Sequence, residues 1–148
     1  MKIATSFIVS GFLCATAFAA ETKVKIEDLP APVQNTIKEQ TKDVTLVGVT
    51  KEKEGGKIVY ELETTANGKA RDLTMDATGA IISVEQEVDL ETVPAAAQAA
   101  IQKKAAGGKI TKVETVTKGS VLYYETAYTK KSGKKAEYSV NADGTAHK

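Results

Sequence analysis

The side chains that most often carry out acid–base, nucleophilic or metal chemistry are scarce in this chain of 148 residues. His147 is the single histidine and stands one position from the last residue, and the single cysteine, Cys14, falls in an apolar first segment. Ser-His-Asp, Cys-His and zinc centres need such side chains on elements that hold them in place. We therefore expect no catalytic residue, no metal site and no cofactor, and the protein is predicted not to be an enzyme.

Carboxylates are the remaining candidates for chemistry. Glu61 and Glu63 lie two positions apart, so they share one side of a strand about 7 Å apart, a separation that would suit glycoside hydrolysis. Glu85, Glu87 and Asp89 form a similar alternating run that could offer oxygen ligands to a hard cation. The run lacks the glycine spacing of a calcium loop. We interpret both sets as charged residues on solvated strand faces.

The first 20 residues predict export. Lys2 precedes an uncharged, mostly apolar run that ends in Ala17-Phe18-Ala19, which is the order of features in a secretory signal peptide. An uncleaved membrane anchor and a lipid-bearing Cys14 are the alternatives, but polar residues dilute the run and large residues precede the cysteine. We expect residues 1–19 to be a cleaved signal peptide, and the protein to be periplasmic or secreted, meeting the membrane only during export.

The rest of the chain repeats its motifs once. At an offset of 64 residues, Val24–Ile37 matches Val88–Ile101 at six of 14 positions. Each copy begins with apolar residues at helical spacing and continues with alternating strand residues, separated by glycine-containing turns. The sequence thus predicts an α+β fold of two tandem units, 20–87 and 88–148, each one helix packed on a three- or four-stranded antiparallel sheet.

The two predicted units carry opposite charge. Residues 21–89 hold nine Lys/Arg and 14 Asp/Glu, a formal charge of −5, whereas residues 90–148 hold ten Lys and five Asp/Glu, a formal charge of +5. We expect the units to dock on each other through these complementary fields, and a polarised surface for an outside partner is the alternative. The balanced total charge of an exported chain argues against a nucleic-acid partner.

Two groups of residues in the second unit are candidates for partner binding. Strand alternation turns Tyr123 and Glu125 away from the face that should meet the helix, and an outward tyrosine can anchor a partner. Lysines surround the Ser132-Gly133 turn and could hold a carboxylate-rich protein or an anionic envelope polymer, although lysines at a turn also serve solubility. The candidate partner-binding residues are Tyr123, Glu125, Lys130, Lys131, Lys134 and Lys135.

The last predicted strand, Lys134–Asn141, has no full strand after it in the sequence. Its outer edge is expected either to be covered by another segment of the chain or to accept a strand from a partner. We favour cover by Thr22–Ile26, because Val24 and Ile26 alternate correctly for a strand.

The order of motifs in both copies resembles that of PepSY-like domains, over nearly the whole chain beyond the signal peptide. The shared features are a proline-containing helix start, a strand with Tyr-Glu and a turn of the form Asx-x-x-Gly before the final strand. They are found as Leu29-Pro30-Ala31-x-Val33, Tyr60-Glu61, Asn67-Gly68 and Asp76-x-x-Gly79, and again as Val93-Pro94-Ala95, Tyr124-Glu125 and Asn141-x-x-Gly144.

This resemblance implies a fold similar to that of the β-lactamase-inhibitor protein and a function in binding. The better-known PepSY members belong to the propeptides of secreted metallopeptidases, which they inhibit. The resemblance therefore implies an exported, non-catalytic module that acts through protein contacts and could inhibit a secreted or periplasmic enzyme. The alternative is a periplasmic binder of a ligand or an anionic envelope polymer, with its site between the two units.

Overall fold

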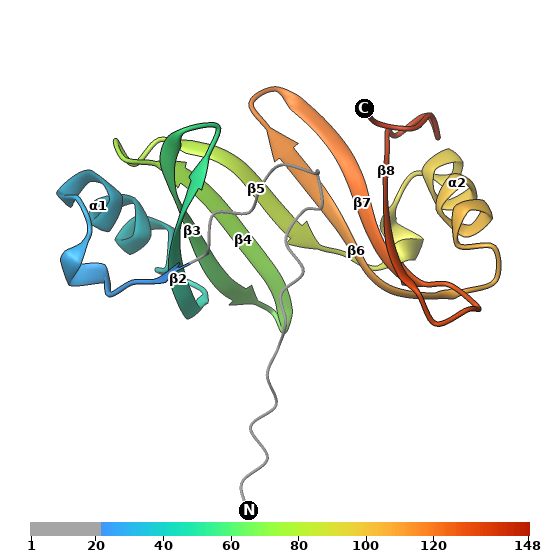
Figure 1. The fold of residues 1–148 in the computed structure, drawn as a ribbon, viewed down its shortest axis with the longest axis horizontal. Helices are drawn as coiled ribbons and strands as arrows, with labels where there is room; N and C mark the ends of the chain where they lie inside the picture. Colours follow the sequence, from blue (N-terminus) through green and yellow to red (C-terminus); the bar gives the residue numbers. More distant parts are fainter. Residues whose placement is uncertain (1–21) are drawn as a thin grey trace, which may run out of the picture.

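The computed structural model describes residues 22–148, so the expected signal peptide lies outside the described residues. One antiparallel sheet of eight strands runs in sequence order, with two α-helices, each preceded by a short 3-10 helix (Figure 1). The strands are β1 (Thr22–Lys23), β2 (Thr45–Glu54), β3 (Lys57–Ala66), β4 (Lys69–Asp76), β5 (Ile81–Glu87), β6 (Lys109–Lys118), β7 (Val121–Thr129) and β8 (Lys135–Val140). The helices are η1 (Ile26–Asp28), α1 (Ala31–Gln40), η2 (Leu90–Thr92) and α2 (Ala95–Ala105). Within this part of the chain, no helix is long and apolar enough to cross a membrane.

The continuous sheet corrects the prediction of two units that each have a small sheet of their own. β5 pairs with β4 on one side and with β6 on the other, from Ser83 opposite Lys118 to Glu87 opposite Glu114. The sequence prediction ended one sheet at β5, which would leave a row of backbone N–H and C=O groups without partners. Pairing with β6 satisfies that row. The two halves are therefore joined by backbone pairing within one sheet.

Each helix covers a hydrophobic core of its own. Val33 and Ile37 of α1 lie one helical turn apart and are buried on the first half of the sheet, and Ala97 and Ile101 of α2 do the same on the second half. The first core contains Leu29, Val33, Ile37, Val49, Tyr60, Leu62, Leu73 and Met75. The second contains Val93, Ala97, Ile101, Val113, Tyr124 and Val140.

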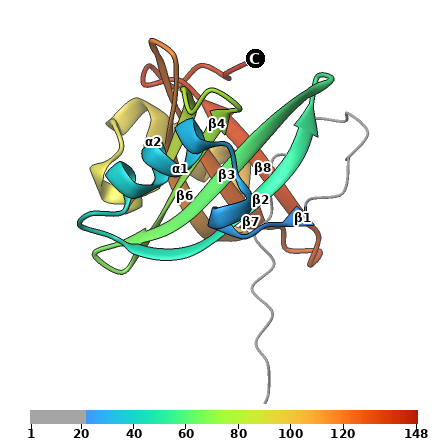
Figure 2. The same ribbon diagram turned by 90° about the vertical axis from the view of Figure 1, so that its left-hand side faces the viewer.

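Both helices lie on the same face of the sheet. Val84 of β5 packs against the first core and is paired with Thr117 of β6. Thr117 is four residues from Val113, which belongs to the second core, and strand residues an even number apart share a face. The helices thus lie towards opposite ends of the molecule but on one side of the strands (Figures 1 and 2).

Glycine turns approach both helices closely. A Cβ atom at Gly79 would lie 2.6 Å from the carbonyl oxygen of Pro32, and one at Gly144 would lie 2.7 Å from that of Ala96. Both glycines also have positive φ, 79° and 85°. Only glycine fits these positions without strain, so the turn and the first helical turn are held together in each half.

The outer edges of the sheet differ from the expectation. The segment expected to cover the last strand pairs elsewhere: Thr22 lies opposite Lys51 of β2. This correction follows from chain length, because β1 is joined to α1 by a short connection and stays within the first half. On β8 the cover is C-terminal, where Ala146 forms a bridge with Val140.

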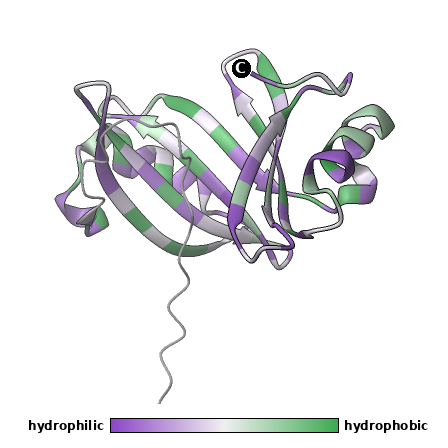
Figure 3. Ribbon diagram, turned by 45° about the vertical axis from the view of Figure 1, so that its right-hand side comes forward, coloured by the Kyte–Doolittle hydropathy of each residue, from purple (hydrophilic) through white to green (hydrophobic). Residues whose placement is uncertain are grey.

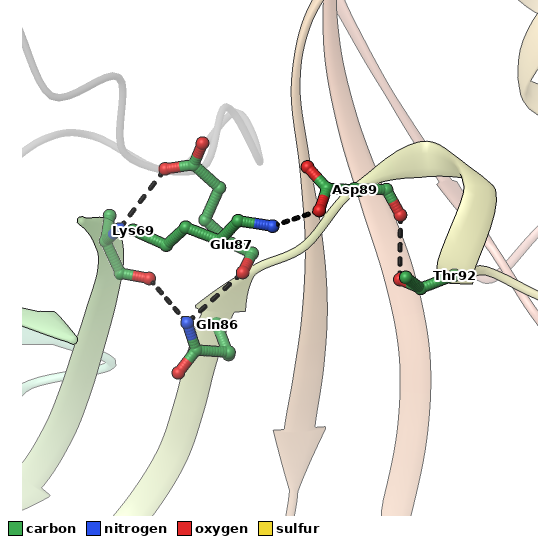
Figure 4. A network of polar contacts seen from close by, with 6 residues as sticks. Lys69, Gln86, Glu87, Asp89 and Thr92 are labelled. Atoms are coloured by element: carbon green, nitrogen blue, oxygen red, sulfur yellow. Dashed lines mark hydrogen bonds and ion pairs between the residues drawn. The ribbon is translucent and has the colours of Figure 1, made fainter. Parts of the chain in front are cut away.

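A polar network holds the chain where it leaves β5 for the second half (Figure 4). Lys69 Nζ lies 2.6 Å from Asp89 Oδ2, and the backbone N–H of Ala70 donates to Glu87 Oε2 at 3.2 Å. Gln86 Nε2 donates to the backbone oxygens of Ala70 and Glu87 at 3.1 and 3.2 Å. The start of β4 and the end of β5 are thereby fixed to each other.

Candidate functional site

The sheet face opposite the two helices, which we call the open face, is the candidate functional site. Side chains alternate between the two faces along each strand, and this alternation is visible in the hydropathy of the ribbon (Figure 3). Pairing places two rows of residues on the open face across neighbouring strands. One row is Glu63, Asp72, Glu85, Val116 and Tyr123, and the next is Glu87, Glu114, Glu125 and Ser139.

Four acidic residues of these rows form what we call the carboxylate cluster: Asp72, Glu85, Glu114 and Glu125. Asp72 lies directly opposite Glu85, and Glu114 lies directly opposite Glu125. Facing residues on neighbouring strands have Cβ atoms about 5 Å apart, and like charges in such pairs repel. Asp72 and Glu114 are only 7% and 9% exposed, and the other two are half-buried. The cluster therefore concentrates negative charge where water screens it poorly.

Lys112 is the cation within this cluster. Its Nζ lies 2.6 Å from Glu114 Oε1. Burial lowers the pKa of Lys112, but the hydrogen bond to Glu114 and the charges of Glu114, Asp72 and Glu85 outweigh burial and raise the pKa above its ordinary value. Lys112 is thus held in its charged form. Its single positive charge faces the four carboxyl groups of the cluster.

The carboxylates of the cluster hold their protons more tightly than free side chains do. Burial raises the pKa of Asp72 to about 6, aided by the charges of Glu114 and Glu63 and opposed by Lys112. Burial, together with the charges of Glu114 and Glu125, raises the pKa of Glu85 to about 7. The pKa of Glu125 is also raised, mainly by burial. The charge of the open face consequently changes between about pH 5 and pH 8.

An aromatic pair lies beside the carboxylates. The rings of Tyr123 and His147 are stacked, and Tyr123 is 6% exposed. Burial, together with the charges of Glu125 and Glu85, raises the pKa of the Tyr123 phenol to about 12. The open face therefore carries an apolar ring next to acidic groups.

The predicted partner-binding residues fall into two separate places. Tyr123 and Glu125 lie on the open face, as strand alternation predicts. The lysines lie exposed at the hairpin between β7 and β8, where the backbone N–H of Lys130 donates to the oxygen of Lys134 at 2.9 Å. Seven residues of extended strand separate Tyr123 from Lys130, or about 24 Å. The structure does not bring the two groups together.

Sequence reasoning misjudged several residues of the open face. The interpretation of Glu85 as a solvated strand residue was wrong, because the side chain is half-buried with a raised pKa. The position of His147, one residue from the last, gives no sign of an ordered contact, whereas its ring stacks on Tyr123. Asp72, Lys112 and Glu114 have no feature in the sequence that marks them as part of a site. Each is a charged residue on one face of its strand. That these side chains lie together becomes evident only once the order of the strands is known.

The arrangement of these side chains limits the ligands they can hold. Among residues 22–148, no group of three or more His, Cys, Asp or Glu side chains is placed to bind a metal ion. The carboxylate cluster straddles the junction of the two halves, on strands β4 to β7. An anionic polymer would be repelled from this junction.

Solved structures with a similar arrangement come from Bacteroides species. A DUF2874 family protein from Bacteroides ovatus has a TM-score of 0.63 at 17% sequence identity, covering 81% of this chain and 85% of the other. A protein from Bacteroides eggerthii described as a candidate periplasmic protein has a TM-score of 0.66 at 17% identity, covering 81% and 86%. A BLIP-like protein (resembling the β-lactamase-inhibitor protein) from Bacteroides fragilis has a TM-score of 0.59 at 15% identity, covering 81% and 84%.

The fold is BLIP-like. This agrees with the fold that the motif resemblance implied, whereas no protein-family model and no curated protein matches the sequence. The PepSY-like assignment accordingly stays a prediction. The expected periplasmic or secreted location agrees with the description of the Bacteroides eggerthii structure.

Proposed function

We propose that this protein is an exported, non-catalytic module that binds a protein partner through the open face of its BLIP-like sheet. The observation that carries the proposal is the contrast between the two faces. Both helices and both hydrophobic cores lie on one face, and the other carries half-buried charged groups beside the stacked rings of Tyr123 and His147. Tyrosine is one of the residue types enriched in binding hot spots, where side chains become shielded from water in the complex.

The finer form of the proposal is that binding inhibits a secreted or periplasmic enzyme. The predicted signal peptide, the motif resemblance and the BLIP-like description of one structural neighbour support it. Export itself is tested by the intact mass of the protein recovered from its own cells. We expect a chain that begins at Ala20, and a retained N-terminus or a lipid on Cys14 would contradict this.

We also propose that residues 20–87 and 88–148 are two PepSY-like copies whose strands have merged into one sheet. Gln34 and Gln98, which match in the sequence at the offset of 64, make the same hydrogen bond in each half. Their Nε2 atoms donate to the backbone oxygens of Leu29 and Val93 at 2.8 and 2.7 Å. A shared contact at matched positions supports a common origin of the two halves.

Site-specific photocrosslinking tests the binding role of the open face. A photoreactive amino acid replaces Ala127, which is half-buried on the open face opposite Lys112. The matched control replaces Gln102, which is exposed on α2. We expect a discrete protein adduct from position 127 in the native cell envelope and none from position 102. Adducts from position 102 alone, or from neither position, would overturn the proposal.

The partner identified by crosslinking can then be used to test whether binding inhibits it. The purified partner is assayed with and without the exported chain, and the variant carrying Tyr123→Ala serves as the comparison. Inhibition that depends on Tyr123 supports the finer proposal. Binding without any effect on activity would leave the protein as a binding module and contradict inhibition.

A further inference from the structure

The negative charge of the open face exceeds the positive charge around it. Apart from the carboxylate cluster, the same face carries Glu63 and Glu87, which neighbour Asp72 and Glu114 across the strands. Lys112 faces the cluster directly, whereas Lys118, on the same face of β6, stands exposed at the hairpin end. Excess charge of one sign on a sheet face favours a partner of the opposite sign.

Lys112 shows which chemistry the cluster accepts. It is a half-buried ammonium whose pKa is raised although burial alone would lower it, so the carboxylates more than compensate its loss of hydration. Asp72 and Glu85 remain protonated at higher pH than usual even with Lys112 in place. The cluster thus has unused capacity to stabilise a second cation.

A second observation concerns the open face as a whole and comes from β2, two strands away from Asp72 on β4, the nearest member of the cluster. Thr50 is 2% exposed and its hydroxyl has no hydrogen-bond partner among the described residues. It lies on the open face opposite Glu61 and two residues from Gly48, where the carboxylate of Glu63 comes within 3.5 Å of the Cβ position. A buried hydroxyl without a partner is costly. A donor or acceptor from outside the chain would satisfy it.

We propose that the open face binds a segment of the protein partner that bears arginine or lysine, with a cationic side chain entering the carboxylate cluster beside Lys112. This inference rests on the proposed function and adds the chemistry of the partner. Arginine fits best, since its planar guanidinium donates to two carboxylates at once and is weakly hydrated. Glu85 and Glu125 are the expected acceptors, because they are the less buried members of the cluster.

Binding of a cation to this cluster is coupled to loss of protons. A positive charge lowers the pKa of a neighbouring carboxyl group, so Asp72 and Glu85, with pKa values of about 6 and about 7 in the free protein, give up protons when the cation enters. Affinity should therefore increase as the pH rises from 5 to 8. A lowering of one pKa by one unit corresponds to about a tenfold gain in affinity.

The test uses the exported chain and a synthetic probe, the blocked peptide Gly-Arg-Gly-Arg-Gly, with a peptide of the same length in which citrulline replaces arginine. Citrulline keeps the shape and hydrogen-bonding groups but has no charge. Amide chemical shifts are followed by NMR during titration at pH 5 and pH 8. We expect the arginine peptide to shift residues of β4 to β7 on the open face, about tenfold more tightly at pH 8, and the citrulline peptide to have little effect.

Two variants and a matched control locate the interaction. Glu85→Gln and Glu125→Gln keep the shape of the side chain and remove its charge, and each should weaken binding of the arginine peptide about tenfold at pH 8. Glu27→Gln changes an exposed glutamate of η1, away from the strands of the open face, and should leave binding unchanged. Calorimetry in two buffers with different ionisation enthalpies measures the number of protons released when the arginine peptide binds. We expect release between pH 6 and pH 7.

Several outcomes would overturn the inference. Three outcomes would each show that the cluster is not the cation site: equal binding of the citrulline peptide, shifts confined to the helices or the lysine hairpin, or an equal effect of Glu27→Gln. If the cation site is contradicted, the proposed protein-binding function is still tested separately, because crosslinking from position 127 detects a partner of any charge. If crosslinking fails while the arginine peptide binds the cluster, the cation site stands and the protein-binding role of the face is contradicted.

Discussion

The ring of Tyr123 is stacked on the ring of His147, with centroids 3.8 Å apart and planes 8° from parallel. His147 is held in place by its own backbone, whose N–H donates to the oxygen of Ser139 at 3.0 Å, and by Asn141, whose Oδ1 lies 2.9 Å from the ring Nδ1. The C-terminal segment thus follows the edge of β8 and places an aromatic ring on the open face. Tyr123 is 6% exposed although no helix covers it, and the ring of His147 lies against its ring.

Removing the histidine ring should therefore expose Tyr123. His147→Ala is expected to lower the free energy of unfolding by about 1 kcal/mol, the size of a stacked aromatic contact. It should also lower the pKa of Tyr123 from about 12 towards the ordinary value, because burial is the main cause of its increase. Urea unfolding measures the first effect, and the pH titration of 13C-labelled tyrosine rings measures the second. His147→Phe keeps the stack and is the control. A Tyr123 titration that does not change in His147→Ala would show that the stack does not bury it.

The raised pKa values of the carboxylate cluster predict how stability depends on pH. In the unfolded chain, Asp72 and Glu85 ionise near pH 4, whereas in the folded chain they ionise near pH 6 and pH 7. The folded state therefore binds more protons than the unfolded state between about pH 4 and pH 8, so the free energy of unfolding falls as the pH rises through this range.

Two isosteric changes test this dependence. Asp72→Asn and Glu85→Gln should each raise the free energy of unfolding at pH 8 by on the order of 1 kcal/mol, since remaining solvent screening reduces the full effect of the shift. Neither should change stability much at pH 4, where the native carboxyl groups are protonated. Urea unfolding at several pH values gives the comparison. A loss of stability at pH 8 in both variants would mean that these carboxylates stabilise the fold.

Local features of the fold could be predicted from the sequence because neighbouring residues determine them. Alternation along β7 places Tyr124 in the second core and Tyr123 on the opposite face, as the structure shows. The turn at Asp76 forms as its sequence suggests, with the backbone N–H of Thr78 donating to Asp76 Oδ1 at 2.8 Å and Gly79 in the left-handed region. Both features depend on spacing over a few residues.

The assembly of the sheet could not be predicted in the same way. An alternating strand such as β5 has the same sequence pattern whether its second edge is free or pairs with β6, so the pattern does not decide between two sheets and one. The carboxylate cluster depends on this choice, since Asp72 and Glu85 come from strands before the junction and Glu114 and Glu125 from strands after it. Each residue alone resembles an ordinary solvated side chain of a sheet.

One continuous sheet predicts that the two halves unfold together. Leu73 belongs to the first core and Ile101 to the second, and both are fully buried. Leu73→Ala and Ile101→Ala should each cost about 2–5 kcal/mol and should shift the same single unfolding transition to lower denaturant concentration. Fluorescence and circular dichroism during urea unfolding would then coincide for both variants. Two separate transitions, each moved by only one of the variants, would show that pairing of β5 with β6 does not couple the halves.

The glycine turns that touch the helices give a prediction with a close internal control. Gly133, at the tip of the β7–β8 hairpin, has φ of 83° and open space around its Cβ position, so Gly133→Ala should cost only the left-handed conformation, about 1–2 kcal/mol. Gly144 has nearly the same φ, 85°, but a Cβ atom there would lie 2.7 Å from the carbonyl oxygen of Ala96. Gly144→Ala should therefore cost about 1–3 kcal/mol more than the control, because the turn must move away from α2. Urea unfolding measures both variants, and equal losses would mean that the contact between this turn and the helix adds nothing to stability.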